Sequence, residues 1–235
     1  MPGGAAHLAN IYGTEEDRVH CPFYLKVGAC RHGDRCSRQH IRPLHSTTIC
    51  LPHMFDNPMA TIAAQQGMNP DLHVDYRKLD EEFDEFYTDV YEELSQYGEI
   101  DELIVVDNLC DHLVGNVMCS YYDEEDADVA RRNLHGRWFG GRQLTCEFSP
   151  VTDFRNATCR QHDEGKCRFR GQCNYVHLRQ MRRSLVEGLR EDQPHRGERS
   201  RRGRDRYDDR DRGRDRRDDR GRSSSRGGDR SRSRG

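Results

Sequence analysis

Two copies of one cysteine and histidine pattern constrain this chain more than any other feature. The first copy is C-x8-C-x5-C-x3-H, and the second is C-x7-C-x5-C-x3-H; their residues are Cys21, Cys30, Cys36 and His40, then Cys159, Cys167, Cys173 and His177. Both copies also read Gly-x-Cys-Arg-x4-Cys-x3-His, over 28–40 and 165–177. The shared flanking residues favour an internal repeat over cysteines that are buried by coincidence.

Three thiolates and one imidazole at such spacing predict a closed tetrahedral zinc site. Segments this short fold only when the metal is bound, so we expect two structural Zn²⁺ ions. Four protein ligands leave no position for an activated water, which argues against zinc catalysis. The other cysteines lie outside the repeats and are interpreted as small buried hydrophobes; they are Cys50, Cys110, Cys119 and Cys146.

The charge distribution divides the 235 residues into two unlike parts. The segment 196–235 holds 17 Arg and 9 acidic residues, a net of +8, and its other residues are Gly, Ser and Tyr207. The remainder holds 21 basic and 32 acidic residues, a net of -11. With nothing apolar to bury, residues 191–235 are predicted to be a disordered Arg-rich tail. No apolar run approaches a membrane span, so we expect a soluble intracellular protein without a membrane partner.

Basic and aromatic side chains accompany both copies of the metal motif. They are Phe23, Tyr24, Lys26, Arg31, Arg35 and Arg38 in the first, and Arg160, Lys166, Arg168, Phe169, Arg170 and Tyr175 in the second. Such sets stack unpaired bases and hold phosphates, which predicts single-stranded RNA as the ligand. The alternative for each aromatic residue is that it only covers the zinc sulfurs.

Between the two motifs, the pattern predicts a β-α-β-β-α-β unit, the ferredoxin-like fold of an RNA recognition motif (RRM). The expected strands are 71–76, 100–106, 114–122 and 144–149, and the expected helices are 79–96 and 126–134. The fold class is therefore α+β. The third strand carries Asn116 and Met118 where an RNA-binding RRM has stacking rings, so RNA binding through this sheet is not expected.

The first helix of this unit has an acidic face without any Lys or Arg between Leu79 and Gln96. A solvated surface is one interpretation, and a basic partner is the other. After the second helix comes Arg137-Trp138-Phe139, which holds the only tryptophan, followed by two glycines. Trp138 is either a core residue or an exposed anchor for a partner. The candidate partner-binding residues are Glu85, Asp89, Glu93, Arg137, Trp138 and Phe139.

This order of modules resembles the small subunit of the U2 snRNP auxiliary factor, a splicing factor family. The resemblance covers about residues 8–186 and is specific at KVGACRHGDRCSR (26–38), DHLVGNV (111–117) and SPVTDFR (149–155). It implies zinc fingers at 15–43 and 152–179, an RRM of the U2AF-homology type at 47–150, and a nuclear location. It further implies that Ser37, Arg160 and Gln161 read nucleotides around the AG at the 3′ end of introns.

The same resemblance implies two protein contacts. The RRM is expected to hold a tryptophan-containing peptide of the large subunit, with Asp89 and Glu93 on its acidic side and the Arg-Trp-Phe loop around it. The tail is expected to contact Arg/Ser-rich splicing proteins, although it has few Ser-Arg steps.

Other functions are weighed against this one. A CCCH regulator of mRNA stability or processing is the alternative, but it has no need for the acidic helix with Arg-Trp-Phe. A zinc-dependent nuclease needs open coordination or a carboxylate cluster, so an enzyme is not expected. An adaptor that binds only protein has no need for two basic fingers. The segment 51–69 has no pattern that assigns it to an element.

Overall fold

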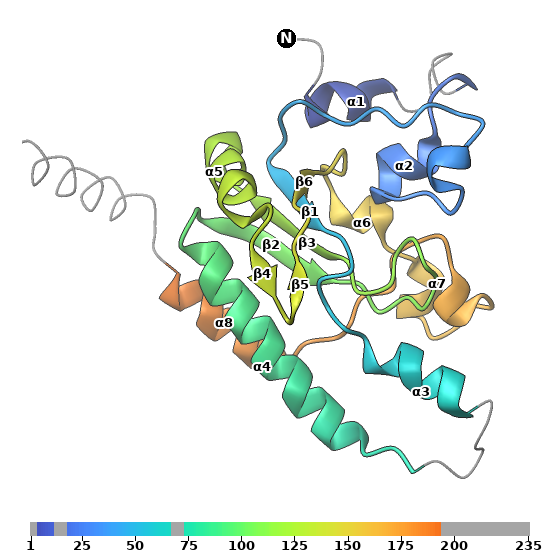
Figure 1. The fold of residues 1–235 in the computed structure, drawn as a ribbon, viewed down its shortest axis with the longest axis vertical. Helices are drawn as coiled ribbons and strands as arrows, with labels where there is room; N and C mark the ends of the chain where they lie inside the picture. Colours follow the sequence, from blue (N-terminus) through green and yellow to red (C-terminus); the bar gives the residue numbers. More distant parts are fainter. Residues whose placement is uncertain (1–3, 12–17, 67–72, 194–235) are drawn as a thin grey trace, which may run out of the picture. The chain divides into compact units, whose positions relative to one another are not determined.

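The computed structural model describes residues 4–11, 18–66 and 73–193. Four strands form one antiparallel sheet in the order β2-β3-β1-β6 (Figure 1); they are β1 (Thr48–Leu51), β2 (Ile100–Val105), β3 (Val117–Tyr121) and β6 (Glu147–Phe148). Helix α4 (Tyr76–Ser95) joins β1 to β2, and α5 (Glu124–Leu134) follows β3. The chain order is β-α-β-β-α-β, which confirms the predicted ferredoxin-like fold of the RRM.

The predicted first strand at 71–76 is wrong. Residues 71 and 72 lie outside the described part of the chain, His73 to Asp75 form no strand, and Tyr76 begins α4. The Asp75 side chain accepts a hydrogen bond from the Lys78 backbone N–H, which caps the helix at its start. The true first strand, β1, pairs with both β3 and β6. It ends at Leu51, where the unassigned segment begins.

One hydrophobic core lies between the sheet and the two long helices. Its α4 members recur every three or four residues, the period of an amphipathic helix, and are Phe83, Tyr87, Val90, Tyr91 and Leu94. Helix α5 contributes Ala127, Ala130 and Leu134, and the strands contribute Ile49, Leu51, Val117 and Cys119 among others. Cys119 and Cys146 are buried in this core and Cys110 in a second cluster, as predicted, whereas Cys50 is half-buried.

A second hydrophobic cluster covers the opposite face of the sheet. It combines Ile104 and Met118 from the strands with Val27 from the first finger and Val176 from the second. Other members include Phe154 and Ala157, which precede Cys159, the first ligand of the second motif. Both fingers therefore share an apolar core with the face that an RNA-binding RRM leaves open. This explains why position 118 is an aliphatic side chain, 1% exposed, rather than an aromatic ring.

Short elements fill the rest of the described chain. They are α1 (Ala5–Ile11), α2 (Pro22–Val27), η2 (Gly33–Arg35), α3 (Pro58–Gln66), β4 (Trp138–Phe139), β5 (Arg142–Gln143), α6 (Phe154–Ala157), α7 (Arg160–Asp163), η3 (Arg170–Gln172) and α8 (Arg183–Asp192). Helix α3 lies in the segment that the sequence left unassigned. In the described ranges, every helix is too short or too polar to cross a bilayer.

Helix α8 lies beside α4, and the residue that follows it binds the edge strand β2. Leu189 and Val186 pack against the main core, and the buried Gln193 side chain pairs with both the N–H and the C=O of Ile100. Tyr91 donates a hydrogen bond to the same side chain. The predicted tail, 191–235, lies outside the described residues from 194 onward, and its first residues complete and follow α8.

Candidate functional site

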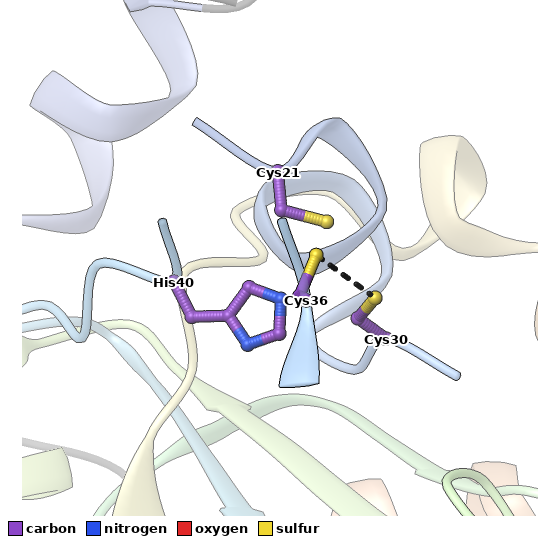
Figure 2. A group of neighbouring side chains, drawn as sticks. All are labelled: Cys21, Cys30, Cys36 and His40. Carbon is purple, nitrogen blue, oxygen red and sulfur yellow. Dashed lines mark hydrogen bonds between the residues drawn. The ribbon is translucent and has the colours of Figure 1, made fainter. Parts of the chain in front are cut away.

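The first metal motif folds its four ligands into one cluster. Figure 2 shows the side chains of Cys21, Cys30, Cys36 and His40 pointing toward one another, and their ligand atoms all lie within 4.8 Å. The Sγ atoms of Cys30 and Cys36 are 3.8 Å apart. Zn–S bonds of about 2.3 Å at tetrahedral angles place two sulfurs about 3.8 Å apart, so the spacing fits zinc. The buried Nε2 of His40 has no hydrogen-bond partner, which leaves it available as a ligand.

The second motif repeats this geometry. Cys159, Cys167, Cys173 and His177 also have ligand atoms within 4.8 Å of one another. The Sγ atoms of Cys159 and Cys173 are 3.9 Å apart, and the buried Nε2 of His177 lacks a partner. Burial, with His162 stacked 3.8 Å away, lowers the pKa of His177 to about 4 and keeps the imidazole in its neutral, metal-binding form. The two clusters are structural zinc sites, each with a complete ligand set.

The two fingers use the same local devices to bring distant ligands together. Helix α2 follows Cys21 and ends at Gly28, whose φ of 80° is strained for a residue with a side chain. Gly165 takes the corresponding place in the second finger, with φ 68°. A single 3₁₀ turn then precedes the third cysteine of each finger, namely η2 before Cys36 and η3 before Cys173. The duplicated glycines and turns account for the shared sequence pattern around the ligands.

The fingers contact each other through residues of the predicted RNA-binding set. The rings of Phe23 and Tyr175 meet edge to face, with centroids 5.9 Å apart. The Lys26 ammonium lies 5.3 Å from the centre of the Tyr175 ring. Phe23 remains partly exposed beside this contact. The two motifs, which lie far apart in the sequence, therefore form one continuous surface.

A pocket of about 500 Å³ opens next to this contact. The second finger contributes four of the predicted RNA-binding residues to its lining: Arg160, Gln161, Phe169 and Tyr175. Lys26 reaches it from the first finger, and Arg155 and Asn156 reach it from α6. Phe169 is 68% exposed, so its ring is accessible beside the pocket. The sequence did not identify Arg155 and Asn156 as candidate RNA-binding residues, because they precede the repeat. Arg155 is nevertheless the last residue of the SPVTDFR stretch, and Asn156 follows it.

The other predicted RNA-binding residues are exposed but lie outside this pocket. They are Arg31, Arg35, Ser37 and Arg38 on the first finger and Lys166, Arg168 and Arg170 on the second. Tyr24 instead follows the alternative interpretation of the aromatic residues. Its ring stacks on the ligand His40, with centroids 4.5 Å apart, so it covers a zinc site.

Cations from elsewhere in the chain partly neutralise the negative charge of the acidic helix α4. Arg179 contacts Asp80 at 2.9 Å, and Arg182 contacts Asp84. Glu93 pairs with Arg137 and accepts a hydrogen bond of 2.6 Å from the Tyr97 hydroxyl. The Glu93 carboxylate therefore connects α4 to Arg137 at the start of the hairpin, and its contact with a partner stays a prediction. Burial raises the pKa of Glu93, yet the bonds from Tyr97 and Arg137 outweigh burial and place the pKa below its ordinary value.

Glu85 and Asp89 remain exposed, and within the described ranges neither has an ion-pair partner. Acidic groups without a cation leave a negative potential over the middle of α4. The uncompensated part of the helix is therefore smaller than the sequence suggested, and it is centred on these two residues.

Trp138 and Phe139 occupy opposite faces of a short hairpin. Strands β4 and β5 pair across Gly140 and Gly141, both at positive φ, as a two-residue hairpin turn requires. Trp138 is 74% exposed, which excludes the core interpretation, whereas Phe139 packs against Phe86. A pocket of about 380 Å³ lies beside Phe139 and α4, with Phe55, Phe83 and Phe86 in its walls.

Comparison with known proteins tests the resemblance. Residues 16–42 match the family model "Zinc finger C-x8-C-x5-C-x3-H type (and similar)". The Schizosaccharomyces pombe splicing factor U2AF 23 kDa subunit is 46% identical over 79% of this chain and 82% of its own length. The mouse splicing factor U2AF 26 kDa subunit is 48% identical over 79% of this chain and 84% of its own. The chain belongs to the U2AF small-subunit family.

The U2AF small-subunit family includes longer members. A U2af small subunit from Arabidopsis thaliana is 48% identical over 79% of this chain, but the match spans 65% of that protein. Among solved structures, the Rna15 RRM with bound RNA is 16% identical with a TM-score of 0.28, over 51% of this chain and 95% of that one. The fold assignment rests on the strand order and connectivity of this chain.

Proposed function

We propose that this protein is the small subunit of a splicing factor that recognises the AG dinucleotide at the 3′ splice site in single-stranded pre-mRNA. The contact between Phe23 and Tyr175 carries the proposal, because it joins two basic, aromatic fingers into one surface. Exposed Phe169 and the pocket beside it offer a stacking place for a base. Ser37 and Gln161, one on each finger, are the proposed readers of bases that flank AG.

The central domain takes a scaffolding role in this proposal. An RRM that binds RNA on its sheet exposes aromatic rings there. In this chain Met118 on the same face is buried under both fingers, and Asn116 is bonded to His112 and His53. RNA is therefore bound by the fingers, which the sheet holds side by side.

The opposite side of the central domain binds the large subunit. The supporting features are exposed Trp138, the uncompensated Glu85 and Asp89, and the apolar pocket beside Phe139. A peptide that carries an aromatic side chain and basic residues complements all three. The heterodimer acts in the nucleus, helps to recruit the U2 snRNP, and needs no catalytic step.

The Arg-rich tail contributes affinity without sequence preference. Its net charge of +8 suits phosphate contacts, which strengthen binding and carry no base information. Contacts with Arg/Ser-rich splicing proteins are a second proposed use of the tail.

One crosslinking experiment tests both halves of the proposal. The full chain is crosslinked in cells, and the bound RNA and the associated protein are identified from the same purification. We expect RNA that is centred on intron 3′ ends with AG, together with a protein whose bound segment is basic and contains tryptophan. Recovery of RNA from the 3′ untranslated regions of mature messages, without such a partner, would instead favour a regulator of mRNA stability.

A further inference from the structure

Asn108 is a fully buried polar residue in the loop that follows β2, and its side chain bonds to the second finger. The Nδ2 group donates to the carbonyl oxygens of Cys173 and Tyr175 at 3.0 and 3.1 Å. The Oδ1 atom accepts from the His177 backbone N–H at 2.7 Å. Its exposed fraction is 0%. Each of the three bonds crosses from the central domain into the segment that carries the last two zinc ligands.

These bonds act on the backbone between the ligands and do not replace any ligand. Cys173 and His177 use their side chains for the metal, whereas Asn108 holds the main chain beside them. The same stretch contains Tyr175, whose ring contacts Phe23 of the first finger. Asn108 therefore fixes the backbone at Tyr175, and with it the position of the ring, relative to the central domain.

Arg179 fixes the same finger where the chain leaves it. Its backbone N–H donates to the carbonyl oxygen of Val105, the last residue of β2, at 3.0 Å. Its side chain, 13% exposed, contacts Asp80 at 2.9 Å and Asp107 at 3.6 Å. The guanidinium also lies 5.1 Å from the centre of the Phe83 ring. The second finger is thus held from both sides of His177.

We propose that Asn108 is a positioning residue for RNA recognition, which sets the second finger against the first so that both contact one RNA strand. The inference rests on the proposed function, since it concerns how the same RNA surface is assembled. Two linked binding modules gain affinity only when both reach their ligands at once. Three hydrogen bonds in a buried site restrict the finger to one orientation, because breaking them leaves buried polar groups unpaired.

The test compares Asn108→Ala with Asn116→Ala in the full chain with the large subunit present. Asn116 is a matched control, because it is 5% exposed and, in the described part of the chain, its side chain bonds only to His53 and His112 of the central domain. Fluorescence anisotropy measures binding to short RNAs that end in UAG or UCG. Zinc content and affinity for the large subunit are measured on the same samples.

We expect Asn108→Ala to weaken UAG binding by about tenfold or more, since it loses part of the gain from linkage. The ratio of the affinities for the UAG and UCG RNAs falls toward one. The variant still binds two zinc ions per chain and keeps its affinity for the large subunit. Asn116→Ala keeps the ratio of the parent. The positioning role is overturned if Asn108→Ala discriminates as the parent does, if it loses zinc, or if both variants lose discrimination equally. A parent protein that does not discriminate contradicts the proposed function itself.

Arg179→Gln provides a second variant in case Asn108→Ala does not fold. It removes the contacts with Asp80 and Asp107 and leaves every zinc ligand in place. A positioning role predicts a lower UAG to UCG ratio. Equal weakening of both RNAs, with a salt slope reduced by about one, indicates a direct phosphate contact instead and contradicts the proposal.

Discussion

At the scale of single residues, Trp138 combines high exposure with a rigid support. The side chain is 74% exposed, while its neighbours Arg137 and Phe139 are held by Glu93 and Phe86. A large aromatic side chain that is displayed in this way loses little conformational entropy when it binds a partner. The sequence left two interpretations of this residue open, because exposure depends on how the hairpin lies against α4.

Replacing this residue separates binding from folding. We expect Trp138→Ala to cost about 2 kcal/mol or more of affinity for the large subunit, roughly a thirtyfold loss. The free energy of unfolding should change by less than about 0.5 kcal/mol, as for other exposed positions. Calorimetric titration and urea unfolding measure the two quantities. Unchanged affinity in the folded variant would exclude Trp138 as an anchor.

The contact between Glu93 and Arg137 gives the hairpin a defined pH dependence. The ordinary pKa of Glu93 is 4.5, and its folded pKa lies lower because the bonds from Tyr97 and Arg137 outweigh burial. The contact therefore stabilises the hairpin above pH 4.5 and loses its contribution as the pH falls through the folded pKa. NMR titration of the carboxyl carbon should give a pKa below 4.5, and Arg137→Gln should raise it. A parent value at or above 4.5 contradicts this assignment.

At the scale of elements, the two fingers were the most predictable part of the chain. Structural zinc sites are typically built from cysteine and histidine, so the spacing of these residues in the sequence identifies both sites. Helix α4 was also predicted, because its buried face recurs with the helical period. The first strand was misplaced because β1 has only four residues and is followed by a segment of about 24 residues, including α3, before α4. Asn108 and Arg179 carry no local pattern, since their partners lie far away in the sequence.

Each finger should bind one zinc ion independently of the other. Cys30→Ser and Cys167→Ser remove one ligand from different clusters, so each variant should bind about one ion where the parent binds about two. Metal analysis of the purified proteins gives the stoichiometry. Urea unfolding of the same variants should still show a cooperative transition of the central domain, because its main core contains none of the zinc ligands. A variant that keeps both ions contradicts the assignment of its ligands.

At the scale of the whole molecule, the sheet has a different partner on each face. Helices α4 and α5 cover one face, and both fingers share a hydrophobic cluster with the other. This second cluster separates the proposed RNA surface from the proposed large-subunit surface. The fingers are thus neither independent modules nor flexible appendages within the described chain. The two fingers also contact each other directly through Phe23 and Tyr175.

The central claim is that the two fingers read RNA jointly, and anisotropy with single-finger variants tests it most directly. Parent, Cys30→Ser and Cys167→Ser proteins are titrated, with the large subunit present, against RNAs that end a pyrimidine tract with UAG or UCG. The parent should prefer UAG, and disruption of either finger should abolish the preference rather than halve it, because neither finger alone holds the strand. A variant with one disrupted finger that still prefers UAG would contradict joint recognition.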